Sequence, residues 1–549
     1  MNTKYLMKVA ALISTLLSGC ALTPISHKLE VPTPTRWQNA PKGDTAADPA
    51  YLARWWKKFQ DPLLDELVLR ALEANHDLQI AAARVQEARS MVTVAESALF
   101  PTIDANVNGG REKRIESVIP IPGPQGVDLV VPRADAVSGE LSLAWEIDVF
   151  GGNRLEAQAA AAKALGAEEG RRAVQVGLLA QVATSYLELR GAQRQTAILR
   201  ENIGLQRERL RLIDAFFRAG LTTELDIARQ QTLLRTTEGT LPVLNHLTAL
   251  LIHRLGVLLG EPPHTLETQL GKAAPLPSAL PNLPGLLPSD LLQQRPDLRR
   301  AQAEVTAAAA SLGAARADLF PRFFISLSGG IGALSLGGLP SLAEGIYALG
   351  AGLTAPIFNA GRIRANITAS DARLAQVAAS YEQAFLTSLE EVENAYVAYT
   401  SARQRREDLR QAVDAARRAY RVAEAFYRRG VTDFLSVLDA QRAKLSAEDE
   451  QAKAETAVAV AVVTLHRAFG GGWDSHEQQG ISSMPQLYAP WSGCGHGQHV
   501  AQRVLVRQLA VVDALDAVAE RTLDVAAVGD QPVTSTEAAW SLPHIALYP

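Results

Sequence analysis

Two stretches of this chain can be laid over one another without a gap, and they decide its fold. NHDLQIAAARVQEARSMVTVAESALFP occupies residues 75–101, and RPDLRRAQAEVTAAAASLGAARADLFP occupies residues 295–321. Both carry Asp-Leu near the start, and both end in Leu-Phe-Pro. Self-similarity of this kind indicates an internal duplication. We therefore expect two structural repeats in one chain.

The match continues after the Leu-Phe-Pro endings. FGGNR, at residues 150–154, corresponds to FNAGR, at residues 358–362. We expect the first repeat over 75–260 and the second over 295–472, each with a helix, a β-hairpin and a long helical hairpin. The stretch between them, 261–294, is rich in proline, which removes a backbone donor and blocks helix continuation. This connector therefore cannot hold a long helix.

Each repeat then alternates between apolar and polar residues. TIDANVN, at 102–108, and GELSLAWEI, at 139–147, have one apolar and one polar face, and the second repeat alternates over 323–327 and 347–353. A period of two indicates strands. At about 8 to 11 residues, such strands are long enough to cross a bilayer when tilted. A small soluble sandwich is the alternative interpretation.

The number of strands bears on assembly. Four strands cannot close a barrel around a polar lumen. Open strand edges in lipid would leave backbone groups unpaired, at a high cost in free energy. If these strands lie in a membrane, several copies of the chain must therefore complete one barrel.

Long helical patterns follow each pair of strands. One runs from Gly152 almost to Phe217, and its counterpart runs from Gly361 to Tyr427. At 1.5 Å per residue, each would be about 100 Å long. Each returns through a second helix, over about 222–258 and 432–469. Such lengths favour a coiled, tubular array of helices. A freestanding fibrous coiled coil is the alternative, but it gives the strands no use.

The N-terminus indicates export. Lys4 and Lys8 precede a short apolar run that ends in Leu-Ser-Gly-Cys. This pattern is typical of a secretory signal over 1–19. The ending is similar to a bacterial lipobox, in which Cys20 becomes the acylated first residue of an arm over 20–74. An ordinary cleaved signal with a chance cysteine is the alternative. The one other cysteine, Cys494, leaves no disulfide partner to an acylated chain.

Composition excludes other classes. The formal charge of −4 over 549 residues and the lack of a basic patch give no reason to expect nucleic acid. No consecutive apolar run after Cys20 reaches the roughly 18 residues of a membrane helix. A chain that crosses a bilayer would therefore do so as strands.

A short phrase occurs at the end of both long helices. RAGLTTELDIARQQ begins at Arg218, and RRGVTDFLSVLDAQ begins at Arg428, a shift of 210 (428 minus 218). At this shift Arg229 of the first copy corresponds to Asp439 of the second. Leu435 lies one helical turn before Asp439 on the same face. Arg442 follows Asp439 by three residues, so the two can pair. A solvated pair on the helix surface is one interpretation.

These elements together resemble a known family. The lipobox, the duplication, the Leu-Phe-Pro endings, FGGNR and FNAGR, and GVTDFLSVLDAQR resemble the outer membrane factors, in their lipoprotein branch of the OprM and NodT type; TolC is a more distant relation. The resemblance covers Cys20 to about Trp473. It implies an α+β membrane protein in which a homotrimer forms a twelve-stranded outer membrane β-barrel, four strands per chain. A long α-helical coiled-coil tunnel would continue it through the periplasm.

The resemblance also implies a function and partners. Family members are exit ducts of tripartite efflux systems, which passively conduct small toxic compounds or drugs and so contribute to multidrug resistance. Their partners are a periplasmic adaptor (membrane fusion) protein and an inner-membrane pump, commonly of the resistance-nodulation-division (RND) type. No cofactor is expected beyond a covalent lipid, such as palmitate, on Cys20. An equatorial region would be built from the arm, the connector and the C-terminal segment.

Two groups of site residues follow from the resemblance. In family members the tunnel narrows at its periplasmic end, where the residues equivalent to Leu435 and Asp439 point inward. Arg442 would pair with Asp439 or with the neighbouring hairpin, and so help to hold the gate shut. The turn residues would contact the adaptor: Arg218, Gly220, Arg428, Arg429 and Gly430. The alternative for the glycines is the positive φ of a helix-ending turn, and for the arginines a plain surface charge.

No catalytic motif is present in the sequence. It lacks His-Glu-x-x-His, Gly-x-Ser-x-Gly and a phosphate loop. His253 and His466, at matching places in the closing helices, are expected to be packing or solvent residues. We expect no enzyme. The remaining alternatives are an outer membrane channel for type I protein secretion and a non-conducting, lipid-anchored periplasmic spacer.

The C-terminal tail departs from the family pattern. Family members end near the GGGW element at 470–473, whereas this chain continues over 473–549 without continuing the duplication. An added equatorial segment, a disordered extension and an altered reading frame are all compatible with its sequence.

Overall fold

The computed structural model describes residues 32–41, 49–112, 118–121, 127–130, 134–283, 285–336 and 342–474. These residues belong to one structural unit within Met1–Gly480. The expected signal peptide, the expected acylation site Cys20, Cys494 and nearly all of the tail lie outside the described residues.

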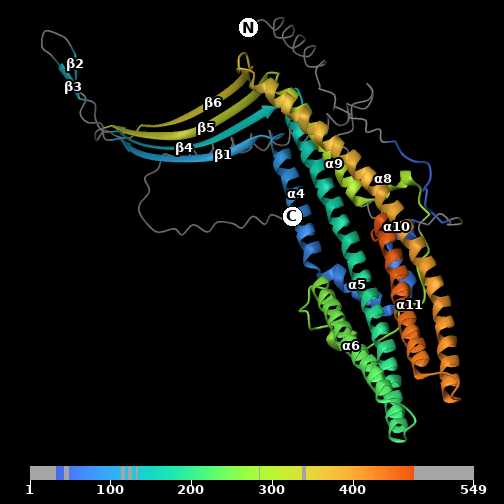
Figure 1. The fold of residues 1–549 in the computed structure, drawn as a ribbon. Helices are drawn as coiled ribbons and strands as arrows, with labels where there is room; N and C mark the ends of the chain where they lie inside the picture. The colour runs from blue at the N-terminus through green and yellow to red at the C-terminus, as the bar shows by residue number, and fades with distance from the viewer. Residues whose placement is uncertain are drawn as a thin grey trace. The chain divides into compact units, whose positions relative to one another are not determined.

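The same element order occurs twice (Figure 1). The first set is α4 (His76–Ser97), β1 (Thr102–Glu112), β4 (Ala134–Ile147), α5 (Gly152–Arg218) and α6 (Glu224–Leu258). The second is α9 (Pro296–Ala317), β5 (Arg322–Leu336), β6 (Leu342–Thr354), α10 (Arg362–Arg428) and α11 (Phe434–Ala468). The long helices α5 and α10 have 67 residues each, and α6 and α11 have 35 each. The predicted helices are confirmed to within a few residues. We call α5–α6 hairpin 1 and α10–α11 hairpin 2.

Shorter elements surround these repeats. They are α2 (Pro49–Ala53), η1 (Trp55–Phe59) and α3 (Pro62–Ala74) before the first repeat, and α7 (Glu267–Leu270), η2 (Pro288–Asp290) and α8 (Leu291–Gln294) in the connector. The connector holds no longer helix among its described residues, in agreement with its proline content.

The four long strands form one antiparallel sheet in the order β1-β4-β5-β6. Its register aligns side chains of like kind: Ile103 lies opposite Leu143, Leu143 opposite Leu327, and Leu327 opposite Leu349. The next row, from Asp104 to Ser328, is polar on three strands. The predicted alternation is therefore confirmed on β1, β4 and β5, whereas β6 has Ala348 in the polar row. Among the described residues, β1 and β6 have one unpaired edge each.

One element was not predicted. The loop between β1 and β4 contains a second, two-stranded sheet of β2 (Val118–Ile121) and β3 (Val127–Val130). Each strand has only four residues. A run of four residues contains too few apolar–polar alternations to be distinguished from a loop. Pro120 lies within β2, and a proline argues against a strand because it cannot donate a ladder hydrogen bond.

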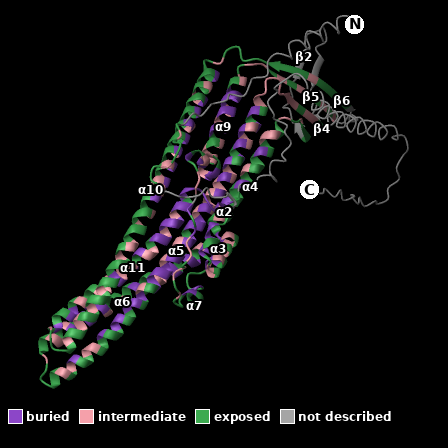
Figure 2. Cartoon of the chain, turned by 90° about the vertical axis from the view of Figure 1, so that its right-hand side faces the viewer, coloured by how far each residue is buried: buried purple, intermediate pink, exposed green. Residues whose placement is uncertain are grey.

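A buried core lies where hairpin 1 meets the N-terminal segment and α11. It contains Trp55, Leu67, Leu179, Tyr186 and Val463 with their neighbours. Figure 2 shows buried residues gathered around α5 next to α3, whereas most of α10 is exposed. The Tyr186 hydroxyl donates to the Asp61 carboxylate at 2.5 Å, and burial raises the pKa of Tyr186 to about 12.

A second cluster fixes the N-terminal arm against the second repeat. The Trp37 indole N–H donates to the Leu286 carbonyl at 2.6 Å and packs beside Phe469. The Glu393 carboxylate accepts from the Gln38 backbone N–H at 2.7 Å and from the Asn39 backbone and side chain. The arm, the connector and the end of α11 therefore meet at one place.

The GGGW element closes the folded body. Two guanidinium groups lie near the Trp473 ring, that of Arg172 at 4.7 Å from the ring centre and that of Arg299 at 5.1 Å. Both arginines pair with Glu169, at 2.7 and 2.8 Å. Burial nevertheless raises the pKa of Glu169. The Trp473 N–H donates to the Gln294 carbonyl at 3.2 Å, which joins the end of the repeats to the connector.

Within the described part of the chain, one helix, α6, is long and apolar enough to cross a membrane by length and composition alone. Only a third of the apolar 18-residue stretch within α6 is buried. However, α6 packs along α5, and Glu238 within it pairs with Arg207 of α5 at 2.7 Å. It also contains Pro242. Helices that pack inside a protein can be equally long and apolar. Because α6 packs along α5, we assign it to the helical hairpin.

Candidate functional site: the tips of the two helical hairpins

Each hairpin turns through a glycine. Gly220 has φ 72° and Gly430 has φ 73°, the left-handed region that favours glycine. The N–H of Leu221 donates to the Phe216 carbonyl and that of Val431 to the Phe426 carbonyl, both at 2.9 Å. These bonds cap the helix carbonyls at both tips in the same way. The sequence-based alternative for the glycines, a helix-ending turn, is confirmed.

The tip arginines are exposed. Arg218 pairs with Asp214 one turn earlier in α5, and Arg428 pairs with Glu424 at 3.1 Å. Arg429 is exposed and has no ion pair among the described residues. Pairs of this kind at the surface contribute little to stability. Breaking either of these two pairs would therefore cost little free energy.

In hairpin 2, the predicted gate residues share the exposed face of α11. Phe434, Val437 and Leu438 are buried, whereas Leu435 is 37% exposed and the Asp439 side chain 63% exposed. The Arg442 guanidinium lies 3.9 Å from the Asp439 carboxylate, at the limit of an ion pair. The expected pair of Asp439 and Arg442 is therefore present, and Leu435 lies one helical turn before it. Their common face points away from the protomer's own core.

In hairpin 1, the corresponding position carries the opposite charge. Arg229 lies 3.6 Å from Asp226 on the same helix. Leu225, which corresponds to Leu435, is also exposed. The helix starts differ as well: the Asp433 carboxylate caps α11 by accepting from the Ser436 N–H at 3.1 Å, whereas Thr223 makes no such bond at the start of α6. The Ser436 hydrogen bonds lower the pKa of Asp433.

A contact between the hairpins was not predicted. Arg209 of α5 donates to the Tyr420 hydroxyl and to the Glu424 carboxylate of α10, both at 2.7 Å. The ammonium of Lys444 lies 5.4 Å from the centre of the Tyr420 ring. We call Arg209, Tyr420 and Glu424 the inter-hairpin latch. No spacing in the sequence relates Arg209 to residues more than 200 positions away, so only the folded chain reveals it.

A small apolar cluster supports the latch. Ile213 of α5 and Leu233 of α6 pack with Phe434, Val437 and Leu438 of α11. Buried apolar contacts of this kind supply most of the packing free energy. Near their tips, the two hairpins of one protomer are therefore held together by one charged and one apolar contact.

The two histidines of the closing helices are packing or solvent residues, as expected. His253 is exposed. His466 is fully buried, stacks on Trp55 with ring centres 5.1 Å apart, and has Nδ1 2.8 Å from the Val462 carbonyl. Burial lowers the pKa of His466 to about 4. Over the described residues, no group of three or more His, Cys, Asp or Glu side chains could hold a metal ion.

A sheet with one apolar face, continued by two long helical hairpins, is the architecture of an outer membrane channel subunit. The profile of the family described as "Outer membrane efflux protein" matches residues 67–255 and 287–471. The chain belongs to this family, so the resemblance noted in the sequence is confirmed. Its members are channel components of efflux systems in the outer membrane.

Individual relatives agree with this assignment. The pyoverdine export outer membrane protein OpmQ of Pseudomonas aeruginosa is 32% identical over 481 residues, which cover 87% of this chain and 99% of that protein. The toluene efflux pump outer membrane protein TtgI of Pseudomonas putida is 31% identical, over 83% of this chain and 96% of that protein.

Solved structures agree as well. The outer membrane channel OprN superposes with a TM-score of 0.72 at 32% identity, covering 83% of this chain and all of that one. The open state of the Neisseria gonorrhoeae MtrE outer membrane channel gives 0.70 at 26%, covering 83% of this chain and 99% of that one.

Proposed function

We propose that three copies of this chain assemble into the exit duct of a tripartite efflux system. One observation carries the proposal: β1 and β6 each have an edge without a partner among the described residues. Open edges are too costly in lipid, so each needs a strand from another copy. Four strands from each of three copies would make twelve, an even number within the range of known barrels. The apolar row from Ile103 to Leu349 would face lipid.

The helical hairpins would form the periplasmic tunnel, closed at the tips of hairpin 2. Under threefold symmetry, Leu435 would form a ring that resists hydration and Asp439 a ring of three carboxylates. Like charges at close range repel, and Arg442 would offset part of that repulsion. The exposure of all three residues on one face supports this role.

The partners follow from the same assembly. A periplasmic adaptor would bind the tips at Arg218, Arg428 and Arg429, on turns formed by Gly220 and Gly430. An inner-membrane pump, of the RND type in the resembling family, would supply the energy, because the duct holds no catalytic group among its described residues. The names of the relatives, which include pyoverdine and toluene, favour small organic compounds as cargo.

The anchoring of the chain is a separate proposal. Cys20 would carry the covalent lipid that places the arm at the membrane. Intact-mass spectrometry of the purified protein is expected to show one acylated form, and Cys20→Ser to lack the added mass. An unmodified wild-type N-terminus beyond Cys20 would instead indicate an ordinary signal peptide.

Single-channel conductance in planar bilayers tests the duct and its gate. We expect a small wild-type conductance that rises clearly in Asp439→Ala, since the substitution removes the ion pairs with Arg442 that would help to hold the gate shut. The matched control is Arg229→Ala at the equivalent position of hairpin 1, which should leave conductance unchanged.

The other outcomes discriminate the alternatives. Equal, sizeable conductance from all three proteins would keep the duct and reject the gate. No conductance from protein shown to be trimeric would reject the duct and favour a non-conducting spacer. Co-purification with a type I secretion exporter instead of an efflux pump would assign the duct to protein secretion.

A further inference from the structure

The duplication places a phenylalanine at every turn between the sheet and the helices. In the Leu-Phe-Pro endings, Phe100 lies between α4 and β1, and Phe320 lies between α9 and β5. In FGGNR and FNAGR, Phe150 lies between β4 and α5, and Phe358 lies between β6 and α10. The four rings therefore occupy two kinds of position, and each kind occurs once in each repeat.

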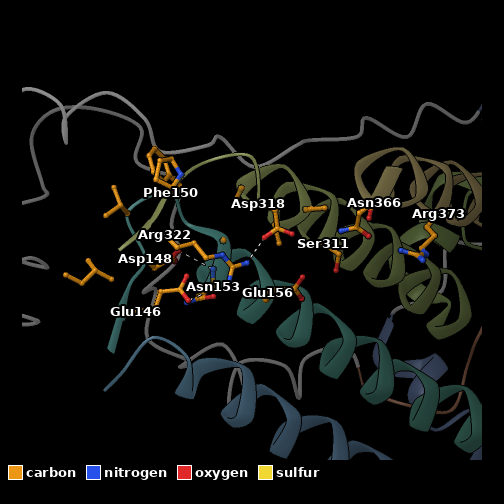
Figure 3. A pocket seen from close by; sticks show the side chains of 18 residues that line it. Glu146, Asp148, Phe150, Asn153, Glu156, Ser311, Asp318, Arg322, Asn366 and Arg373 are labelled. Atoms are coloured by element: carbon orange, nitrogen blue, oxygen red, sulfur yellow. Dashed lines mark hydrogen bonds and ion pairs between the residues drawn. The ribbon is translucent and has the colours of Figure 1, made fainter. Parts of the chain in front are cut away.

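One ring of each kind meets the other within the chain. The Phe150 ring stacks on the Phe320 ring, with centroids 4.7 Å apart and planes at 21°, and both residues are half-buried. This contact joins the two repeats where the end of β4 pairs with the start of β5, with Ile147 opposite Phe323. Figure 3 shows Phe150 at this junction, among the residues that end β4 and begin α5.

The other two rings have no such contact among the described residues. Phe100 is 67% exposed and Phe358 is 88% exposed, and neither ring packs on another described aromatic ring. The backbone does not explain the difference, because the two Leu-Phe-Pro turns are alike. The Phe100 N–H donates to the Ser97 carbonyl at 3.1 Å, and the Phe320 N–H donates to the Ala317 carbonyl at 3.0 Å. Phe100 is therefore presented as Phe320 is, but without the ring that covers it.

The sheet explains why one chain cannot join the exposed rings. Phe100 comes just before β1 and Phe358 comes soon after β6, and these strands lie at opposite edges of the sheet (Figure 1). They are also the edges that the proposed duct pairs with strands of other copies. Each exposed ring therefore lies at an edge where another copy is expected.

We propose that Phe358 of one copy stacks on Phe100 of the next, as Phe150 stacks on Phe320 within one chain. The proposal rests on the proposed function, because it takes the partner to be a second copy of this chain. Each copy gives Phe358 to one neighbour and Phe100 to the other, so the contact is heterologous and closes a ring. Aromatic pairs favour such stacking beyond the area that they bury.

The repeat relation also supplies the strand register between copies. The two motifs recur at shifts of 208 (358 minus 150) and 220 (320 minus 100) residues. Applied to the pair at the junction of β4 and β5, these shifts bring Ala355, just after β6, opposite Ile103 of the next copy. Leu353 then lies opposite Ala105 of the next copy, so the apolar face of the sheet continues across the boundary.

Paired cysteines test the contact in the full chain carrying Cys494→Ser, purified in detergent. With a short bismaleimide, Phe100→Cys combined with Phe358→Cys should give covalent dimers and trimers on denaturing gels. Phe150→Cys combined with Phe320→Cys is the positive control; it should keep the mass of one chain, with a single linker joining both thiols. Phe100→Cys combined with Phe320→Cys, two equivalent positions that do not meet, should give neither product.

Alanine variants give an independent measurement. Phe100→Ala and Phe358→Ala should each raise the dissociation constant of the oligomer about tenfold or more, because each removes a buried ring pair. The double variant should lose little more than either single variant, since both substitutions remove the same contact. Analytical ultracentrifugation over a range of protein concentrations measures the three constants against wild type.

Two results would overturn the proposal and leave the duct standing. One is a trimeric, conducting wild type whose Phe100–Phe358 cysteine pair gives no product between chains while the Phe150–Phe320 pair reacts. The other is additive losses from the two alanine substitutions, which would place the rings in separate surroundings such as the lipid-facing aromatic girdle of a barrel. A wild-type protein that is monomeric in detergent would overturn both this proposal and the duct. Cross-linked trimers without conductance would overturn the duct alone.

Discussion

Hairpin 1 and hairpin 2 have helices of the same lengths but very different surroundings. In hairpin 1, α5 packs against α3, α4, α6, α9 and α11, whereas in hairpin 2 α10 packs mainly against α9 and α11. Leu179 of α5 is fully buried, but Leu389, at the same place in α10, is only partly buried. Duplication therefore supplied the same backbone twice, and the contacts made by each copy decide what its residues do.

The tips of the two hairpins also share their backbone structure and differ in their side chains. Each hairpin turns through an identical glycine cap, yet Arg229 of hairpin 1 stands where hairpin 2 has Asp439. The capping residue at the start of the return helix also differs, Thr223 against Asp433. The two tips therefore have the same backbone geometry but different charges. This difference is expected if only hairpin 2 of each protomer forms the proposed gate.

The largest expected difference concerns the core. Leu179→Ala removes a fully buried side chain from α5 and should lower the free energy of unfolding by about 2 to 5 kcal/mol. Leu389→Ala removes the same atoms from a partly buried site and should cost about half as much or less. Denaturant titration of both variants in detergent measures this. Equal losses would mean that the oligomer buries α10 as deeply as α5.

The two histidines should differ in their effect on acid stability. His466 has a pKa of about 4 when folded and about 6.5 when unfolded, so the unfolded chain takes up the proton first. Stability is then lost as the pH falls from about 6.5 to 4, by on the order of 3 kcal/mol. His466→Gln should remove this component from the pH dependence of the melting temperature, and His253→Gln, at an exposed site, should not. An unchanged acid slope in His466→Gln would assign the loss to other groups.

The coupling free energy between Arg209 and Glu424 of the inter-hairpin latch should exceed that of an ion pair within one hairpin. Arg209 is 12% exposed and Glu424 is 25% exposed, whereas Arg207, which pairs with Glu238 inside hairpin 1, is 63% exposed. A double-mutant cycle with Arg209→Ala and Glu424→Ala should give a coupling of about 1 to 2 kcal/mol. The same cycle on Arg207 and Glu238 should give less than about 1 kcal/mol. Equal coupling free energies would show that the latch stabilises the protein no more than an exposed surface ion pair does.

The smallest effect is expected at the helix starts. Asp433→Ala removes the hydrogen bond to the Ser436 N–H, so hydrogen exchange at the first turn of α11 should become faster. Thr223→Ala should leave the first turn of α6 unchanged, because the threonine hydroxyl does not cap it. Exchange measured by mass spectrometry on both variants, with wild type as reference, decides between them. Similar changes at both turns would indicate that Thr223 caps α6 in solution.

Much of the fold could be predicted because its signals are local. The long helix expected from Gly152 to Phe217 is observed as Gly152–Arg218, since the preceding turn and the tip glycine mark both ends. The alternation of TIDANVN and GELSLAWEI placed β1 and the end of β4. The strands extend further than predicted, to 15 residues in β5, because glycines such as Gly329 and Gly330 interrupt the apolar pattern.

The candidate site was predicted only in part, for a related reason. Leu435, Asp439 and Arg442 lie within two helical turns, so their common face follows from helical spacing. The latch between Arg209 and Glu424 joins residues 215 positions apart. The contact of Trp473 with Arg172 and Arg299 likewise joins α5, α9 and the end of the repeats. Contacts of this range depend on the path of the chain, and one sequence does not record that path.

The sequence by itself determined the duplication, the helix lengths, the glycine turns and the two-sided character of the strands. These properties depend on residues a few positions apart, through backbone conformation and periodicity. Only the tertiary structure decided that β4 pairs with β5 across the two repeats, that α5 is buried while α10 is exposed, and that Arg209 meets Glu424. Such features arise from packing between segments far apart in the sequence, where two copies of one pattern encounter different neighbours.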